Sequence, residues 1–149
     1  MNVFFVSAPT FADLDGDGDL DAVVGSDGGA LRYFENTGTA TAPIFTTERH
    51  GAANPFNGVP IFGYGNPTFA DLDRDGDLDA VVGARYFENT GTATAPIFTT
   101  ERIGAANPFN GLYAGYHDPT RPTFVDLDDD GDLDALFGAS DGTVRLRTH

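Results

Sequence analysis

Short apolar runs, each following a stretch rich in aspartate, recur along this chain of 149 residues. The most regular of these runs are residues 22–25, 80–83 and 135–138, and each of them ends in glycine. Apolar runs of this length, bounded by turn residues, indicate buried strands. No stretch keeps a sustained 3.6-residue apolar period, so we expect little helix and an all-β chain.

These strands belong to an internal repeat. Repeat one spans residues 9–66, repeat two residues 67–121, and a partial third repeat residues 122–149. Residues 33–49 and 51–58 return unchanged as residues 86–102 and 104–111. The length suits one core better than two, so we expect a single repeat domain over residues 1–149.

Each full repeat is expected to form four short antiparallel strands. In repeat one the expected strands are residues 9–13, 20–25, 30–35 and 43–49. Asp27 and Gly28 supply a hairpin turn between the second and third strands. Pro43 opens the fourth strand, which suits an outer edge that need not donate a hydrogen bond there.

The second and third repeats depart from this plan. Repeat two lacks five residues at the hairpin turn, so it must close the hairpin around Gly83 and Ala84 or lose it. Repeat three ends after its third expected strand, residues 143–147. Residues 3–6 could substitute for a fourth strand there, although they align with the linkers between repeats. The chain therefore holds about two and a half four-stranded units.

A nine-residue acidic loop separates the first two strands of every repeat. Aspartate occupies its positions 1, 3, 5, 7 and 9, and glycine occupies position 6. Alternate side chains on a tightly curled backbone offer hard oxygen ligands, and the glycine takes the sharp turn. The candidate metal residues are Asp13, Asp15, Asp17, Asp19 and Asp21 in loop one, Asp71, Asp73, Asp75, Asp77 and Asp79 in loop two, and Asp126, Asp128, Asp130, Asp132 and Asp134 in loop three.

Calcium is the cation that suits such a loop. Ca²⁺ accepts six to eight oxygens in flexible geometry, whereas Mg²⁺ demands a stricter octahedron. An EF-hand is excluded because its position 12 requires glutamate, and the residues here are Val24, Val82 and Phe137. One such loop could be a solvated acidic turn, but three copies at identical spacing favour three Ca²⁺ sites.

Composition narrows the possible partners. The net charge is −15 and lysine is absent, which argues against nucleic acid. Without cysteine there is no disulfide or thiolate metal site. No apolar run is long enough to span a membrane. The first residues lack the basic and apolar regions of a signal peptide, so we expect any secretion signal to lie outside this chain.

The acidic loop, the apolar strand that ends in glycine, and the phrase Tyr-Phe-Glu-Asn-Thr-Gly at residues 33–38 resemble FG-GAP/VCBS-type repeats. Such repeats form the blades of β-propellers in integrin α-subunit heads and bacterial surface proteins. The resemblance implies four-stranded blades in an incomplete β-propeller, and an extracellular or cell-surface, bacterial setting. It also implies that the side chains at loop positions 1, 3, 5 and 9 and the carbonyl at position 7 bind Ca²⁺. The Gly-Ala-Pro of the integrin version is absent, and residues 137–139 come nearest to it.

The sequence bears on three classes of function: an enzyme, a carbohydrate-binding module and a structural or adhesion module. We expect no enzyme, because the clustered aspartates lie in structural-type loops and no nucleophile elbow or phosphate loop occurs. A carbohydrate-binding, lectin-like module is the alternative, since aromatic rings either line sugar-binding grooves or pack blade against blade. The aromatic candidates are Tyr33, Phe34, Phe56, Phe62, Tyr64, Tyr113 and Tyr116.

The favoured hypothesis is a calcium-binding structural or adhesion module. An open stack of blades exposes an apolar face at each end and an unpaired edge. We therefore expect head-to-tail self-association into a ring or a filament, or further blades in a longer parent chain. A glycan or protein surface ligand is compatible with this hypothesis.

Overall fold

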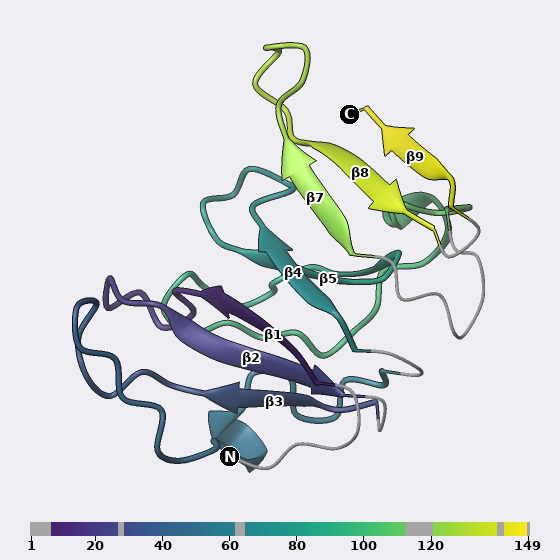
Figure 1. The fold of residues 1–149 in the computed structure, drawn as a ribbon. Coiled ribbons are helices and arrows are strands. Elements are labelled where there is room, and N and C mark those ends of the chain that lie inside the picture. Colours follow the sequence, from purple (N-terminus) through teal and green to yellow (C-terminus); the bar gives the residue numbers. More distant parts are fainter. Residues whose placement is uncertain (1–6, 27–28, 62–64, 113–120, 140–141, 149) are drawn as a thin grey trace.

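The computed structural model describes residues 7–26, 29–61, 65–112, 121–139 and 142–148. This part of the chain forms antiparallel sheets of three strands each, one in each repeat, stacked along the molecule (Figure 1). The strands are β1 (Ser7–Ala12), β2 (Asp21–Ser26) and β3 (Leu31–Phe34), then β4 (Pro67–Ala70), β5 (Asp79–Val82) and β6 (Arg85–Phe87), and finally β7 (Pro122–Val125), β8 (Asp134–Gly138) and β9 (Val144–Arg147). The predicted all-β fold is confirmed.

The three sheets share one register. Phe11 pairs with Ala22, Phe69 with Ala80, and Phe124 with Ala135. In each sheet the second strand is central and the acidic loop joins it to the first. Because side chains alternate along a strand, this shared register gives equivalent residues the same face in every sheet. We call the face turned toward the preceding repeat the head face, and the opposite one the tail face.

The prediction of a fourth strand at residues 43–49 is wrong. Residues 43–49 make one isolated bridge to the sheet, between Arg49 and Tyr33. The Ile44 N–H instead donates to the Asn36 side chain at 2.8 Å, and the Ile44 carbonyl accepts the Thr37 N–H at 3.1 Å. The backbone is thus bonded to the turn after β3 rather than to a strand ladder. Repeat two repeats this arrangement with Asn89, Thr90 and Ile97.

Of the two alternatives for repeat two, the structure has the tight hairpin rather than its loss. Val82 pairs with Arg85, which leaves Gly83 and Ala84 as the two turn residues. Gly83 has φ 66°, as the first central residue of a type II′ turn requires. The five missing residues therefore shorten the connection without breaking the sheet.

Two 3₁₀ turns, η1 (Gly51–Ala53) and η2 (Gly104–Ala106), lead into segments that join the repeats. We call residues 51–61 and 104–112 the first and second hook. The Asn54 side-chain amide donates to the Leu31 carbonyl at 3.2 Å, and its oxygen accepts the Phe56 N–H at 2.9 Å. The second hook repeats both bonds through Asn107, Ala84 and Phe109.

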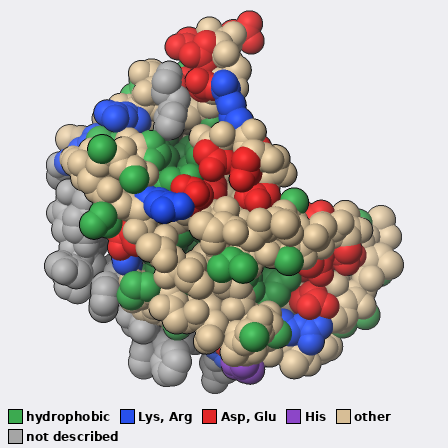
Figure 2. All heavy atoms as spheres, turned by 180° about the vertical axis from the view of Figure 1, so that it is seen from behind, with side chains coloured by type: hydrophobic (Ala, Val, Ile, Leu, Met, Phe, Trp, Pro, Cys, Tyr) green, Lys and Arg blue, Asp and Glu red, His purple; other side chains and the backbone are tan. Residues whose placement is uncertain are grey.

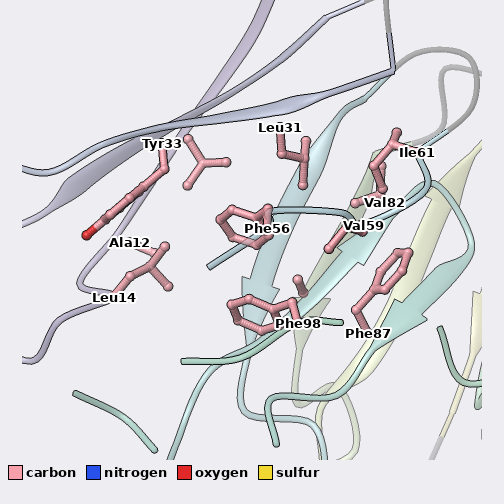
Figure 3. Close-up of a cluster of buried hydrophobic side chains, with 12 residues drawn as sticks. Ala12, Leu14, Leu31, Tyr33, Phe56, Val59, Ile61, Val82, Phe87 and Phe98 are labelled. Carbon is pink, nitrogen blue, oxygen red and sulfur yellow. The ribbon is translucent and has the colours of Figure 1, made fainter. Parts of the chain in front are cut away.

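Each hook inserts a phenylalanine between consecutive sheets. Phe56 packs among Leu31 and Tyr33 of the first sheet and Val82 and Phe87 of the second (Figure 3). Its ring stacks on that of Phe98 at a centroid distance of 4.8 Å. The second hook does the same, since Phe109 lies 5.8 Å from Phe124 and 5.3 Å from Phe137. The repeated Asn-Pro-Phe sequence thus builds the core between repeats.

Candidate metal centres

The structure brings the first three aspartates of every acidic loop together. Within each of these triads, one carboxylate oxygen from every member lies within 4.8 Å of the others. The triads are Asp13, Asp15 and Asp17, then Asp71, Asp73 and Asp75, and finally Asp126, Asp128 and Asp130. Three convergent carboxylates offer the hard oxygen ligands that Ca²⁺ prefers.

The loop backbone is curled around these carboxylates. In loop one Asp13 accepts the N–H groups of Gly16 at 2.7 Å and Gly18 at 3.1 Å. The position-6 glycines Gly18, Gly76 and Gly131 have φ of 92°, 94° and 90°, so they take the left-handed turn predicted for them. The curl therefore arises from the loop's own aspartate and glycine residues.

Position 4 is also left-handed, which the sequence analysis did not predict. Gly16 has φ 73°, Arg74 has φ 64° and Asp129 has φ 62°. This conformation is uncommon for residues with a side chain. It points Arg74 toward loop three, where its guanidinium pairs with Asp132.

The aspartate at position 9 lies outside the triads and is tied into the sheet. Asp21 is buried and accepts the Leu14 N–H at 3.2 Å and the Asn36 N–H at 2.8 Å. It also accepts the Tyr33 hydroxyl at 2.8 Å. Burial raises the pKa of Asp21, against the lowering by these donors. Its assignment as a metal ligand stays a prediction.

In repeat two, Asp79 makes the equivalent hydrogen bonds. Asp79 accepts the Leu72 N–H at 3.2 Å, the Tyr86 hydroxyl at 3.0 Å and the Asn89 N–H at 2.8 Å. Burial raises the pKa of Asp79 to about 6. In repeat three Leu146 occupies the tyrosine position, and Asp134 accepts the Leu127 N–H at 2.9 Å.

At position 7 the structure places buried carboxylates where the sequence analysis used only a carbonyl. Oδ1 of Asp19 and Oδ1 of Asp77 are buried, and neither has a hydrogen-bond partner among the described residues. Oδ1 of Asp71, at position 1 of loop two, is in the same state. A buried charged oxygen without a partner is costly. A cation would remove this cost, so the donor atoms of loops one and two fit a bound metal.

The electrostatics point the same way. Burial raises the pKa of Asp15 to about 6, and the nearby charge of Asp21 adds to the rise. Burial also raises the pKa of Asp73 and of Asp128, and neighbouring loop aspartates contribute in each case. Figure 2 shows acidic side chains gathered in separate clusters on one face of the molecule. Each cluster concentrates negative charge that a divalent cation would neutralise.

Several residues around the loops were missed from sequence. Tyr33 and Asn36, with Tyr86 and Asn89 in repeat two, anchor the position-9 aspartate. The repeated phrase Tyr-Phe-Glu-Asn contains both residues of each pair, but only the pairing of the second and third strands shows that they meet Asp21 and Asp79.

Three of the seven aromatic candidates for sugar binding lie among the described residues, and all three belong to the core. Tyr33, Phe34 and Phe56 are each 5% exposed or less. They pack within or between sheets, as the alternative interpretation of these rings expected. Phe62, Tyr64, Tyr113 and Tyr116 lie outside the described residues.

Stacked antiparallel sheets that each carry an acidic loop at the same place, and that are linked by repeated hooks, define an all-β repeat module. Residues 13–82 match the model of the FG-GAP-like repeat family, from the first acidic loop to the end of β5. The chain therefore carries an FG-GAP-type repeat, which confirms the family resemblance. No curated protein and no solved structure matches the chain. None of the described residues forms a helix long and apolar enough to cross a membrane.

Proposed function

We propose that the chain is a non-catalytic, calcium-binding structural or adhesion module that works outside the cell. The observation that carries this proposal is the triad of convergent carboxylates, which occurs three times at identical loop positions. Each triad lies between the first two strands of its sheet. A cation bound there would therefore have a structural role, holding the two strands together, and no catalytic role.

Ca²⁺ is the ion we propose for all three loops. The donors are carboxylate and carbonyl oxygens, which suit the irregular coordination of Ca²⁺ better than the strict octahedron of Mg²⁺. In extracellular modules such sites function at the high Ca²⁺ concentrations outside the cell. This is the basis for the proposed extracellular or cell-surface setting.

A matched pair of substitutions in loop three tests the calcium sites. Asp130 belongs to the triad, whereas its neighbour Asp129 at position 4 does not. Asp130→Asn and Asp129→Asn remove the same charge, and asparagine tolerates the φ of 62° at position 129. In calorimetric titrations of EGTA-treated protein we expect the unmodified chain to bind three Ca²⁺, Asp130→Asn two, and Asp129→Asn three. A chain that takes up no Ca²⁺ would sink the proposal.

We also propose that the module works in an array, formed by self-association or by further repeats of a longer chain. In support, each hook covers the tail face of its own sheet and the head face of the next. The head face of the first sheet and the tail face of the third have no such cover among the described residues. Exposed apolar faces of this kind are typical of interaction surfaces.

A further inference from the structure

The head face of the first sheet is equivalent to the head faces that pack in the joints between repeats. The head face of the second sheet, with the segment after it, supplies Phe69, Leu78, Ala80, Val82, Phe87 and Phe98 to the core around the first hook. The equivalent residues of repeat one are Phe11, Leu20, Ala22, Val24, Phe34 and Phe45. Phe11 packs against Phe45 at 6.1 Å but stays 56% exposed, and Leu20 is exposed as well.

The tail face of the third sheet is likewise equivalent to the tail faces that pack in the joints between repeats. Its residues Val125, Leu127, Leu136, Val144 and Leu146 are all exposed. In the first sheet the equivalent residues Ala12, Leu14, Val23, Leu31 and Tyr33 are all buried in the core around the first hook. Leu136 is 40% exposed, whereas Val23 and Val81 at the same position are completely buried.

We propose that the tail face of the third sheet binds the head face of the first sheet in a second copy of this chain. This inference rests on the proposed function in an array and names its occupant and its two surfaces. In both internal joints, between sheets one and two and between sheets two and three, a tail face packs against a head face around a hook. In a stack of repeats, an uncovered tail face is buried by the head face of another repeat.

The tail face of sheet three is suited to direct contact without a hook. The hook motif Asn-Pro-Phe-Asn-Gly occurs twice in the sequence, at residues 54–58 and 107–111, and both copies are used in the internal joints. Sheet three carries Val125 where the other sheets have Ala12 and Ala70, and Leu136 where they have valine. In a contact between copies, these larger side chains would take up part of the space that Phe56 and Phe109 occupy in the internal joints.

Charges in the acidic loops affect the strength of this contact. At the internal joint between repeats two and three, position 4 of one loop meets position 7 of the next, where Arg74 pairs with Asp132. A contact between copies with the same geometry places Asp129 opposite Asp19 of the second copy. Two like charges weaken the contact, and Ca²⁺ in both loops reduces the repulsion. Association should therefore be stronger with Ca²⁺ than with EGTA.

A gain-of-function variant tests this geometry directly. Asp129→Arg copies Arg74, and the two positions share a left-handed φ, 62° and 64°. It converts a repulsive pair into an attractive one, so we expect association to tighten by about tenfold in Ca²⁺. Sedimentation velocity over a range of protein concentrations measures this change. Unchanged or weaker association of Asp129→Arg would overturn the proposal.

Blocking one face at a time supplies the second test. Leu127→Glu charges the tail face and Phe11→Glu the head face, at positions that are 55% and 56% exposed, so both variants should fold. Each variant alone should be monomeric, and an equimolar mixture should form a one-to-one dimer and nothing larger. A monomeric unmodified chain, or a mixture that does not dimerise, would overturn the proposal. If the chain still binds three Ca²⁺ in calorimetry, the calcium-binding function stands while this inference falls.

Discussion

At the scale of single residues, one buried carboxylate ties each acidic loop of the first two repeats to its sheet. The three donors to Asp79 come from the loop, from the third strand and from the turn that follows. One side chain therefore fixes three segments that lie apart in sequence. The triad aspartates differ, since they are partly or fully exposed and their oxygens face one another.

We predict that Asp79→Ala destabilises the chain even without calcium. It leaves the N–H groups of Leu72 and Asn89 without this acceptor, so we expect a loss of about 3 kcal/mol in the free energy of unfolding. Urea denaturation in EGTA measures the loss. Asp75→Ala is the control, because this exposed triad member should change the stability in EGTA by only about 0.5 kcal/mol. Equal losses for both variants would contradict this role of Asp79.

The raised pKa of Asp79 gives a pH dependence whose direction is fixed. With a folded-state pKa of about 6 against an ordinary 3.8, the folded chain holds a proton that the unfolded chain lacks between these values. Stability in EGTA should therefore increase as the pH falls from 7 to 5. Melting temperatures in EGTA at the two pH values measure this, and Asp79→Asn should reduce the difference to the part that Asp15, whose pKa is also raised to about 6, contributes. A lower melting temperature at pH 5 for the unmodified chain would contradict it.

At the scale of elements, nearly identical sequences have different environments in the two full repeats. Phe98 is completely buried between the first hook and the second sheet. Phe45, its equivalent in repeat one, is only half-buried and packs against its own sheet. The difference arises from the preceding repeat, which supplies a hook to Phe98 and none to Phe45.

We predict that truncation of these two rings has unequal effects. Phe98→Ala should cost about 3–5 kcal/mol, because it opens a cavity beside Phe56 and Phe69. Phe45→Ala should cost clearly less when measured at protein concentrations where the chain is monomeric. Chemical denaturation of both variants makes the comparison, and equal costs would mean that the hook contributes little to the core.

The glycine that follows the apolar run of each second strand gives another matched pair. A Cβ on Gly25 would lie 1.3 Å from the Gly65 carbonyl oxygen, whereas a Cβ on Gly138 meets nothing within 4 Å. We expect Gly25→Ala to cost at least about 2 kcal/mol and Gly138→Ala less than about 0.5 kcal/mol. Thermal unfolding of the two variants distinguishes them, and similar melting temperatures would contradict the close packing at Gly25.

The elements that could be predicted from sequence are those defined by local chemistry. The acidic loops, their glycine turns and the apolar second strands follow from spacing alone. The expected strand at residues 43–49 failed because its composition favours a strand, while Asn36 captures its backbone from eight residues away. The hooks were visible as a repeated sequence, but only the stacking of the sheets shows what Phe56 and Phe109 contact.

At the scale of the whole molecule, the acidic loops bring charge from successive repeats close together. Loop two and loop three line one small cavity through Arg74 and Asp132, and the charge of the complete chain is −15. Three divalent cations would cancel less than half of that charge, but they would act where the carboxylates converge. Each site should add about 2.7 kcal/mol at a hundredfold excess over Kd, or roughly 5–10 °C in melting temperature.

This localisation predicts how salt and calcium act together on the melting temperature. In EGTA, 1 M NaCl shortens the Debye length to about 3 Å and screens repulsion among the loop carboxylates, so the melting temperature should rise toward that of the calcium-bound chain. With Ca²⁺ bound, the same salt should change it little, because the repulsion is already removed. Differential scanning calorimetry with NaCl in both states measures the two responses. An equal rise in both states would show that repulsion outside the loops, spread over the whole chain, limits its stability.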